Sequence, residues 1–317
     1  MLPPMLIFFP IFTLLEDLGY LPRVAFTLDN TFRKCCSCGK QSLTMAMGFG
    51  CNAVGVTGSR IIDSKRERLI SIITNVFVPC NGRFPTIIML ISMFFVSGNN
   101  SFLSSLILVL IVLSGIFMTF LVSYLLSKTV LKGEPSSFVL ELPPYRKPVI
   151  MKTIIRSICD KTLNILSKTV KVSIISGILI WLISNIFIND LSLLNHFANF
   201  FNGFGVLIGL DGAIIVGFLL GFPANEIVFP IILMIYMSSS NICELPSLEI
   251  LKEILISNNW TFTTALCMVT FCLFHFPCST TCLTIKDETK SFKWTMLAFI
   301  LPTIIGIILC FMLNLLF

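Results

Sequence analysis

The chain has 317 residues, of which 56% are hydrophobic and 12% charged, with a mean hydropathy of +0.95 and a formal net charge of +6. A soluble domain carries about a quarter of its residues as Asp, Glu, Lys or Arg, so this composition excludes an ordinary soluble globular domain. The apolar residues form long blocks, and roughly 20 of them make one helical span. Because lipid offers no partner to unpaired backbone groups, we expect an all-α, polytopic membrane protein.

The first half of the chain alternates apolar and basic segments. An apolar stretch at its start ends at Glu16-Asp17 and resembles the end of a span whose beginning is missing, with no basic region of the kind that opens a signal peptide. A basic stretch and a short glycine-interrupted piece follow, and then two spans joined by a polar turn. In chain order, these segments are 1–15, 20–44, 45–58, 71–97 and 102–127, with the turn at 97–100.

A hydrophilic segment at about 128–171 separates the two halves. It holds nine Lys and Arg residues against Glu134, Glu141 and Asp160, and its part from 149 to 170 has the pattern of an amphipathic helix lying on a membrane surface. Further spans are expected at 172–189, 206–236, 262–285 and 295–317, with the long block 206–236 broken at Gly221-Phe222-Pro223. We therefore predict a first repeat at 1–127, a basic linker at 128–171 and a second repeat at 172–317.

The distribution of charge predicts the orientation. Seventeen of the 22 Lys and Arg residues lie in 20–70 and 128–171, so the positive-inside rule places both on the cytoplasmic side. The acidic loop 237–260, with Glu244, Glu249 and Glu253, should then face outward, and the block 206–236 should dip into the membrane and return. The positive charge therefore indicates membrane topology and attraction to anionic lipid rather than nucleic-acid binding.

Two matched pairs of motifs indicate an internal repeat. The first half has Gly48-Phe49-Gly50-Cys51-Asn52 and then Val78-Pro79-Cys80, and the second half has Gly221-Phe222-Pro223-Ala224-Asn225-Glu226 and then Phe276-Pro277-Cys278. Inserted from opposite sides, such pieces form an inverted repeat whose unwound segments meet near the midplane and offer helix ends to a solute. The alternative is structural, because glycine and proline are common in membrane helices.

Ionisable and soft side chains inside the apolar blocks are candidates for a solute path. Glu226 lies in an otherwise uncharged stretch, where a carboxylate costs about 2.5–3.5 kcal/mol unless it faces a cavity or a partner. Arg83 is either that partner or an arginine that reaches the surface. A structural ion pair or helix cap is the alternative for Glu226.

The cysteines after the two prolines suit a transition metal. Each proline frees the carbonyl one turn earlier, so each pair Pro79-Cys80 and Pro277-Cys278 could present a thiolate beside a bare carbonyl. His275 would share a helix face with Cys278 if the turn is intact, and Cys51 is a further candidate. The alternative for every cysteine is a small buried hydrophobe.

Other chemistry is not indicated. Cys35, Cys36 and Cys38 lack the second pair that would complete a zinc site, and we interpret Cys267, Cys272, Cys282 and Cys310 as packing residues in a reduced protein. A phosphate-binding loop, HExxH and GxSxG are missing from the sequence, so no enzyme activity is expected.

Several runs resemble the bacterial ferrous-iron transporter B family. They are 15–23 (LEDLGYLPR), 48–52, 140–146 (LELPPYR), 221–226 and 276–278, together with Lys286-Asp287-Glu288-Thr289 and Trp294. The resemblance covers nearly the whole chain, and it is most similar to the clostridial type. It implies two Gate domains in inverted arrangement, a bacterial cytoplasmic membrane location, and Fe²⁺ as transported substrate with no permanently bound cofactor. It also implies that Cys80 and Cys278 lie along the metal path, with Glu226 as the glutamate of the second Gate motif.

The resemblance also implies a partner. Family members carry an N-terminal G-protein domain with a phosphate-binding loop, so we expect a separately encoded G-domain or other transporter subunits, and a homo-oligomer is possible. The leading hypothesis is a ferrous-iron permease core that uses Cys80, Cys278, Asn52, Asn225 and Glu226. The alternatives are a Gate-domain carrier for a nucleoside or other organic solute, and a non-transporting remnant or partner subunit.

Overall fold

The computed structural model describes residues 2–96, 101–133, 150–157, 163–188, 191–237 and 248–317. Apart from one two-stranded ribbon, in which β1 (Phe187–Ile188) pairs antiparallel with β2 (Leu191–Ser192), the described elements are helices. The predicted all-α class is confirmed. The turn 97–100, the run 140–146, and Glu134, Glu141, Asp160 and Glu244 lie outside the described residues.

The chain forms two compact units, each built from segments of both halves of the sequence. Unit 1 comprises 1–81, 112–169 and 280–300, and unit 2 comprises 82–111, 170–279 and 301–317. The helices that lie wholly in unit 1 are α1 (Leu2–Asp17), α2 (Tyr20–Lys34), α3 (Gln41–Gly50), α4 (Asn52–Gly58), α5 (Lys65–Thr74) and α8 (Ile150–Arg156).

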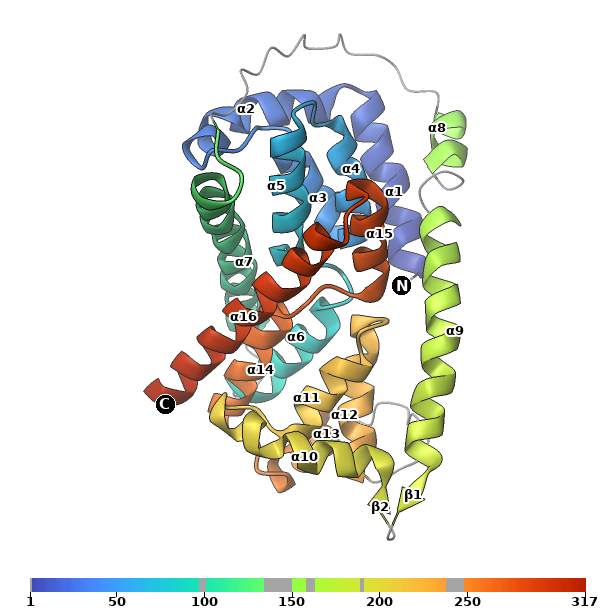
Figure 1. The fold of residues 1–317 in the computed structure, drawn as a ribbon, viewed down its shortest axis with the longest axis vertical. Coiled ribbons are helices and arrows are strands. Elements are labelled where there is room, and N and C mark those ends of the chain that lie inside the picture. The colour runs from blue at the N-terminus through green and yellow to red at the C-terminus, as the bar shows by residue number, and fades with distance from the viewer. Residues whose placement is uncertain (1, 97–100, 134–149, 158–162, 189–190, 238–247) are drawn as a thin grey trace. The chain divides into compact units, whose positions relative to one another are not determined.

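The helices that lie wholly in unit 2 are α6 (Phe84–Leu90), α10 (Leu193–Leu207), α11 (Gly212–Leu220), α12 (Val228–Met237), α13 (Leu248–Ser257) and α14 (Phe262–Phe274). The chain passes between units within α7 (Ser101–Thr129), α9 (Leu163–Asn185), α15 (Ser279–Thr289) and α16 (Phe292–Leu316). Within unit 2, α11 and α12 pack against each other and α10 turns sharply into α11 (Figure 1).

Four described helices are long and apolar enough to span a membrane: 101–129, 166–185, 262–289 (with its break) and 292–316. The predicted spans 102–127 and 295–317 are therefore confirmed as α7 and α16. The predicted span 172–189 belongs to α9, which starts earlier and ends at Asn185. The prediction of one span over 71–97 is wrong, because the helix stops before Val78 and α6 is short.

The block 206–236 also differs from its prediction. The break at Gly221–Pro223 is present, but helix α10 already begins at Leu193, and the chain bends by 112° between α10 and α11. The chain turns at Gly209, which has a left-handed φ of 73° and ends α10, and Asp211 then starts α11 because its carboxylate accepts a hydrogen bond of 2.7 Å from the Ile214 N–H. The block is thus a bent pair followed by a returning helix.

Two residues of the basic segments, Arg60 and Lys168, form ion pairs with α15 within unit 1. Arg60 donates two hydrogen bonds to Glu288 at 2.9 and 2.7 Å, and Lys168 pairs with Asp287 at 2.5 Å. The predicted amphipathic segment 149–170 contains α8 and the start of α9, and its residues 149 and 158–162 lie outside the described residues. Helix α8 packs on α1, where Thr153 donates to Asp17 at 2.5 Å.

Candidate functional site

The two sequence motifs that end in asparagine form the same backbone break. Cys51, between α3 and α4, has φ −158° and ψ 125°, and Ala224, before the 3-10 turn 225–227, has φ −153° and ψ 122°. Each of these extended residues interrupts an apolar helical segment, and each is followed by a buried asparagine, Asn52 or Asn225. The conformation of the chain thus repeats at the positions that the motifs matched.

The two motifs with proline and cysteine form a second pair of breaks. In the first, the 3-10 turn 75–77 leads to Val78 in an extended conformation, as expected for a residue before proline. In the second, α14 ends at Phe274 and His275 is extended. The chain is non-helical at 78–80 and 275–278. His275 and Cys278 therefore do not share a helix face, and that expectation was wrong.

Within unit 1 the two breaks are hydrogen-bonded to each other. The Asn75 side chain donates to the Asn52 carbonyl at 3.1 Å. With its amide oriented to suit its surroundings, the Asn52 nitrogen lies 3.2 Å from the carbonyl oxygens of Gly48, Asn75 and Val78. The Asn52 side chain therefore links the end of α3 to the segment that follows α5.

Asn75 is a site residue that the sequence reading missed. Its side chain is 1% exposed and lies against Gly48 and Gly55, where an added Cβ would come within 2.7 and 2.5 Å of the amide. The carboxamide oxygen of Asn75 has no hydrogen-bond partner among the described residues. In the sequence, the feature that could have indicated this residue is a single asparagine in the apolar run before Val78-Pro79-Cys80.

Within unit 2 the two breaks also lie side by side. The Ser279 N–H donates to the Phe222 carbonyl at 2.8 Å, and His275 Nε2 lies 3.3 Å from the Asn225 amide oxygen. His275 is 1% exposed and its Nδ1 lies 2.8 Å from the Cys272 carbonyl. The His275 ring therefore lies between the end of α14 and the break at Asn225.

Arg83 is buried in unit 2, with an exposure of 0%, so the alternative of an arginine that reaches the surface is excluded. Its guanidinium donates to the Leu273 carbonyl at 2.8 Å and to the His275 carbonyl at 3.2 Å. In an unbroken helix the Leu273 carbonyl would receive the N–H of residue 277, which proline lacks. A cation also suits the C-terminal end of a helix such as α14.

The carbonyls freed by the two prolines are therefore occupied. Pro79 frees the Asn75 carbonyl, which accepts from the Val78 N–H at 3.1 Å and faces the Asn52 amide, and Pro277 frees the Leu273 carbonyl, which Arg83 takes. The expectation of bare carbonyls beside Cys80 and Cys278 was wrong. Each break is closed by a side chain from another segment instead.

The remaining candidates lie on or beside the breaks. Cys80 is 8% exposed, whereas Cys51, Cys278 and Glu226 are partly exposed. Among the described residues, no three His, Cys, Asp or Glu side chains gather as they would around a metal ion. A metal ion at either break would therefore depend on amide or water oxygens as well as thiols.

The other cysteines have structural surroundings. Burial raises the pKa of the Cys38 thiol to about 12, which disfavours the thiolate that zinc requires. Cys267 and Cys310 are fully buried and share sulfur-to-carbonyl contacts of 3.7 and 3.3 Å. These two behave as the packing residues that were predicted.

Comparisons with known proteins match most of this chain. The family model Gate, described as "Nucleoside recognition", matches residues 1–94 and 166–292, and the model described as "Ferrous iron transport protein B C terminus" matches 108–160. No solved structure matches the chain significantly.

Curated relatives match nearly from end to end of this chain. The Fe(2+) transporter FeoB of Staphylococcus aureus strain MSSA476 is 33% identical over 98% of this chain and 45% of its own length. The Methanocaldococcus jannaschii Fe(2+) transporter FeoB is 25% identical over 98% of this chain and 48% of its own. A Porphyromonas gingivalis Fe(2+) transport protein A/FeoB fusion protein is 28% identical over 94% of this chain and 40% of its own. The chain thus spans less than half the length of these relatives.

The repeated helix breaks and the Gate match define a multi-pass membrane protein of the Gate class, located in a bacterial cell membrane. The chain belongs to the ferrous iron transport protein B family.

Proposed function

We infer that this chain is the membrane permease core of a ferrous-iron importer, and that it acts as a transporter rather than as an enzyme. The single observation that carries this inference is the repeated pair of helix breaks, each with a buried asparagine and a Pro-Cys dipeptide. The relatives named Fe(2+) transporter FeoB supply the identity of the ion.

The depth of the breaks supports a solute site inside the membrane. Helix α11 has nine residues and α3 has ten, which gives lengths of about 13–15 Å at 1.5 Å per residue. These lengths are roughly half of the ~30 Å hydrocarbon thickness. Helices that stop at that depth end near the midplane, where non-helical backbone is tolerated only inside protein or beside a water-filled cavity.

The chemistry of the breaks suits a weakly held divalent transition metal. The break in unit 1 offers the Cys80 thiol, with Cys51 as a further candidate, and the amide of Asn52. The break in unit 2 offers the Cys278 thiol, the amide of Asn225, the Glu226 carboxylate and the His275 ring. Such a mixture fits Fe²⁺ better than a hard cation. Fe²⁺ binds weakly in the divalent series, so the ion can leave again.

The glycines and prolines have a supporting role in this proposal. Gly48, Gly50 and Gly221 lie at the ends of α3 and α11, while Pro79, Pro223 and Pro277 prevent the helices from continuing. Arg83 stabilises the end of α14. Together these residues keep the backbone non-helical at the breaks and stabilise it there, and in this proposal the two repeats alternate access around these positions.

Transport is further proposed to depend on a G-protein domain or on other transporter subunits. The chain would hold no permanent cofactor. The proposal is compatible with a single copy of the chain and with a homo-oligomer. The Porphyromonas relative is named as a fusion of Fe(2+) transport protein A with FeoB, which makes a transport protein A another candidate partner.

Uptake of ⁵⁵Fe²⁺ into proteoliposomes, with and without an added G-domain, tests the proposal. We expect uptake by the wild type, and a strong loss of maximal rate when Cys80→Ser and Cys278→Ser are combined. Cys310→Ser is the matched control, because that buried cysteine lies outside the breaks. Uptake that is equal in all three proteins would remove the thiols from the mechanism, and uptake of a nucleoside instead of Fe²⁺ would favour the organic-solute alternative.

A further inference from the structure

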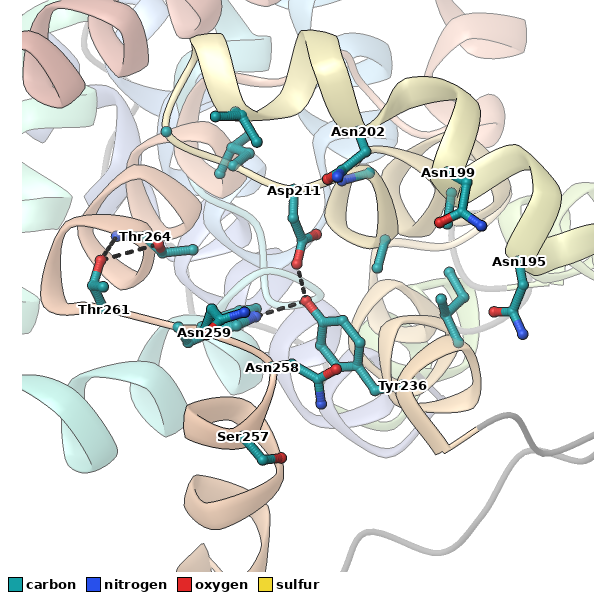
Figure 2. A pocket seen from close by; sticks show the side chains of 18 of the residues that line it. Asn195, Asn199, Asn202, Asp211, Tyr236, Ser257, Asn258, Asn259, Thr261 and Thr264 are labelled. Atoms are coloured by element: carbon teal, nitrogen blue, oxygen red, sulfur yellow. Dashed lines mark hydrogen bonds between the residues drawn. The ribbon is translucent and has the colours of Figure 1, made fainter.

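Unit 2 contains a polar cavity of about 640 Å³ that the proposed ion site does not use (Figure 2). It lies where the α10–α11 bend, the end of α12 and the α13–α14 turn meet. Its polar lining side chains include Asn195, Asn199, Asn202, Asp211, Tyr236, Ser257, Asn258, Asn259, Trp260, Thr261, Thr263, Thr264 and Asn314.

A fixed carboxylate lies in this cavity. Trp260 Nε1 donates to the Tyr236 hydroxyl at 2.6 Å, and that hydroxyl in turn donates to Asp211 Oδ2. Asp211 Oδ1 accepts the Ile214 N–H at 2.7 Å. The two bonds to the carboxylate come from α11 and α12, so the carboxylate is held in place, yet they use only part of its acceptor capacity.

The cavity suits a ligand that is positively charged and rich in hydrogen-bond donors. Among the described residues that line it, Asp211 is the one charged side chain, so the lining carries a net negative charge. Asn195, Asn199 and Asn202 follow one another at helical spacing along one wall, and their amides supply further polar groups (Figure 2). A single carboxylate among neutral amides is too little to strip a metal ion of its water.

The helices of unit 2 connect this cavity with the breaks. Helix α11 follows Asp211 and ends before the break at Gly221, and α12 returns from Val228, after that break, to the cavity at Tyr236. Helix α14 starts after Thr261, which lines the cavity, and ends at Phe274, directly before His275. All three helices therefore lead from the cavity to the paired breaks.

We propose that this cavity is a capture site for a hydrated divalent cation, which binds through its water shell to Asp211 and the surrounding amides before it reaches the breaks. The ion's identity as Fe²⁺ rests on the proposed function, but the binding site itself does not. Six waters occupy roughly 180 Å³ at liquid density, so the cavity holds an ion with its full first shell. The positive-inside rule places the loop 237–260, whose last residues line the cavity, on the outer side of the membrane, where an importer receives its ion.

Fluorescence of Trp260 tests the proposal directly, with Mn²⁺ as an air-stable, quenching probe. The full chain carries Trp181→Phe and Trp294→Phe, so that Trp260 is the only tryptophan, and is reconstituted in lipid nanodiscs. We expect saturable quenching by Mn²⁺, relieved by Mg²⁺, which does not quench tryptophan and gives up its waters reluctantly. Asp211→Asn keeps a good helix cap but should weaken binding about tenfold, as expected for the loss of one nearby charge.

Two further variants keep the test decisive. Glu253→Gln removes an exposed carboxylate of α13 that is not part of the lining, and should leave the quenching unchanged. Asn199→Ala changes an exposed amide of the wall, so it should fold normally and weaken binding several-fold. Quenching that is absent, that is as strong in the Asp211 and Asn199 variants as in the parent protein, or that persists in excess Mg²⁺ would overturn the capture site. A response of Trp260 to a nucleoside but not to Mn²⁺ would overturn it too.

Uptake separates this inference from the proposed function. Asp211→Asn should raise the Fe²⁺ concentration needed for half-maximal uptake and leave the maximal rate unchanged, whereas the double cysteine variant lowers the maximal rate. Quenching without any uptake would refute the transport proposal alone. Uptake without quenching would refute the capture site alone.

Discussion

Arg83 offers the sharpest test of how the breaks are stabilised. Arg83→Met keeps the length and apolar stem of the side chain but removes both donors to the Leu273 and His275 carbonyls. Each buried carbonyl left without a donor costs about 1–3 kcal/mol. Removal of the buried charge returns part of its desolvation cost, so we expect a net loss of about 2–5 kcal/mol.

The assay is thermal unfolding of purified protein in detergent, followed by the fraction that remains monodisperse after heating. Arg83→Met should lower the midpoint by several degrees, and Arg83→Lys should fall between it and the wild type because an ammonium lacks the planar fork that reaches two carbonyls.

Arg60→Met is the matched control. Arg60 also donates two hydrogen bonds, but it is 71% exposed, and exposed pairs contribute about 0–1 kcal/mol. If the Arg83 and Arg60 variants unfolded at the same temperature, Arg83 would not be the group that closes the break, and the reasoning would be refuted.

Two other predictions follow from the packing of unit 1. Gly55→Ala should destabilise the protein by about 1–3 kcal/mol, because the new Cβ would lie 2.5 Å from the Asn75 amide and 2.7 Å from the Thr44 carbonyl. The control is Gly177→Ala, whose Cβ meets nothing within 4 Å. In thermal unfolding this control should be neutral or slightly stabilising. Equal effects of the two changes would contradict the tight contact at Asn75. In variants with a single cysteine, Cys38 should react with maleimide far more slowly than the partly exposed Cys36 at pH 8, because its raised pKa of about 12 leaves few thiolates. The rate at Cys38 should still rise above pH 10, and a plateau below pH 9 would show that the raised pKa is wrong.

The sequence predicted the features that depend on local composition. Helices α7 and α16 are long, uncharged apolar runs, and hydropathy alone finds them. The breaks at Cys51, Pro79, Gly221 and Pro277 follow from glycine and proline, which act on the backbone at their own positions.

Features made by contacts between distant residues were not predictable. Arg83 closes a helix end 190 residues further along the chain, and nothing near Arg83 in the sequence points to that partner. Helix α11 begins after the 112° bend at Asp211, whose role as a helix cap could not be recognised within a block that has the composition of one long apolar run. Asn75 was passed over because a single asparagine in an apolar stretch carries little signal by itself.

The occupied carbonyls show the same limit. Proline predicts correctly that a carbonyl loses its helical donor, but whether that carbonyl is offered to a solute depends on what packs against it. Here the Asn52 amide and the Arg83 guanidinium fill the two positions. The sequence therefore located the breaks but not the groups that close them.

Protection of the two Pro-Cys thiols by the transported ion tests the central claim most directly. In proteins with Cys80 or Cys278 as the only cysteine, a small water-soluble thiol reagent is applied under anaerobic conditions with and without Fe²⁺. We predict that both thiols are labelled from the aqueous phase and that Fe²⁺, but not Mg²⁺, slows the labelling of each. Labelling by lipid-soluble reagents alone, or rates that Fe²⁺ leaves unchanged, would contradict the claim that the broken helices line the path of the ion.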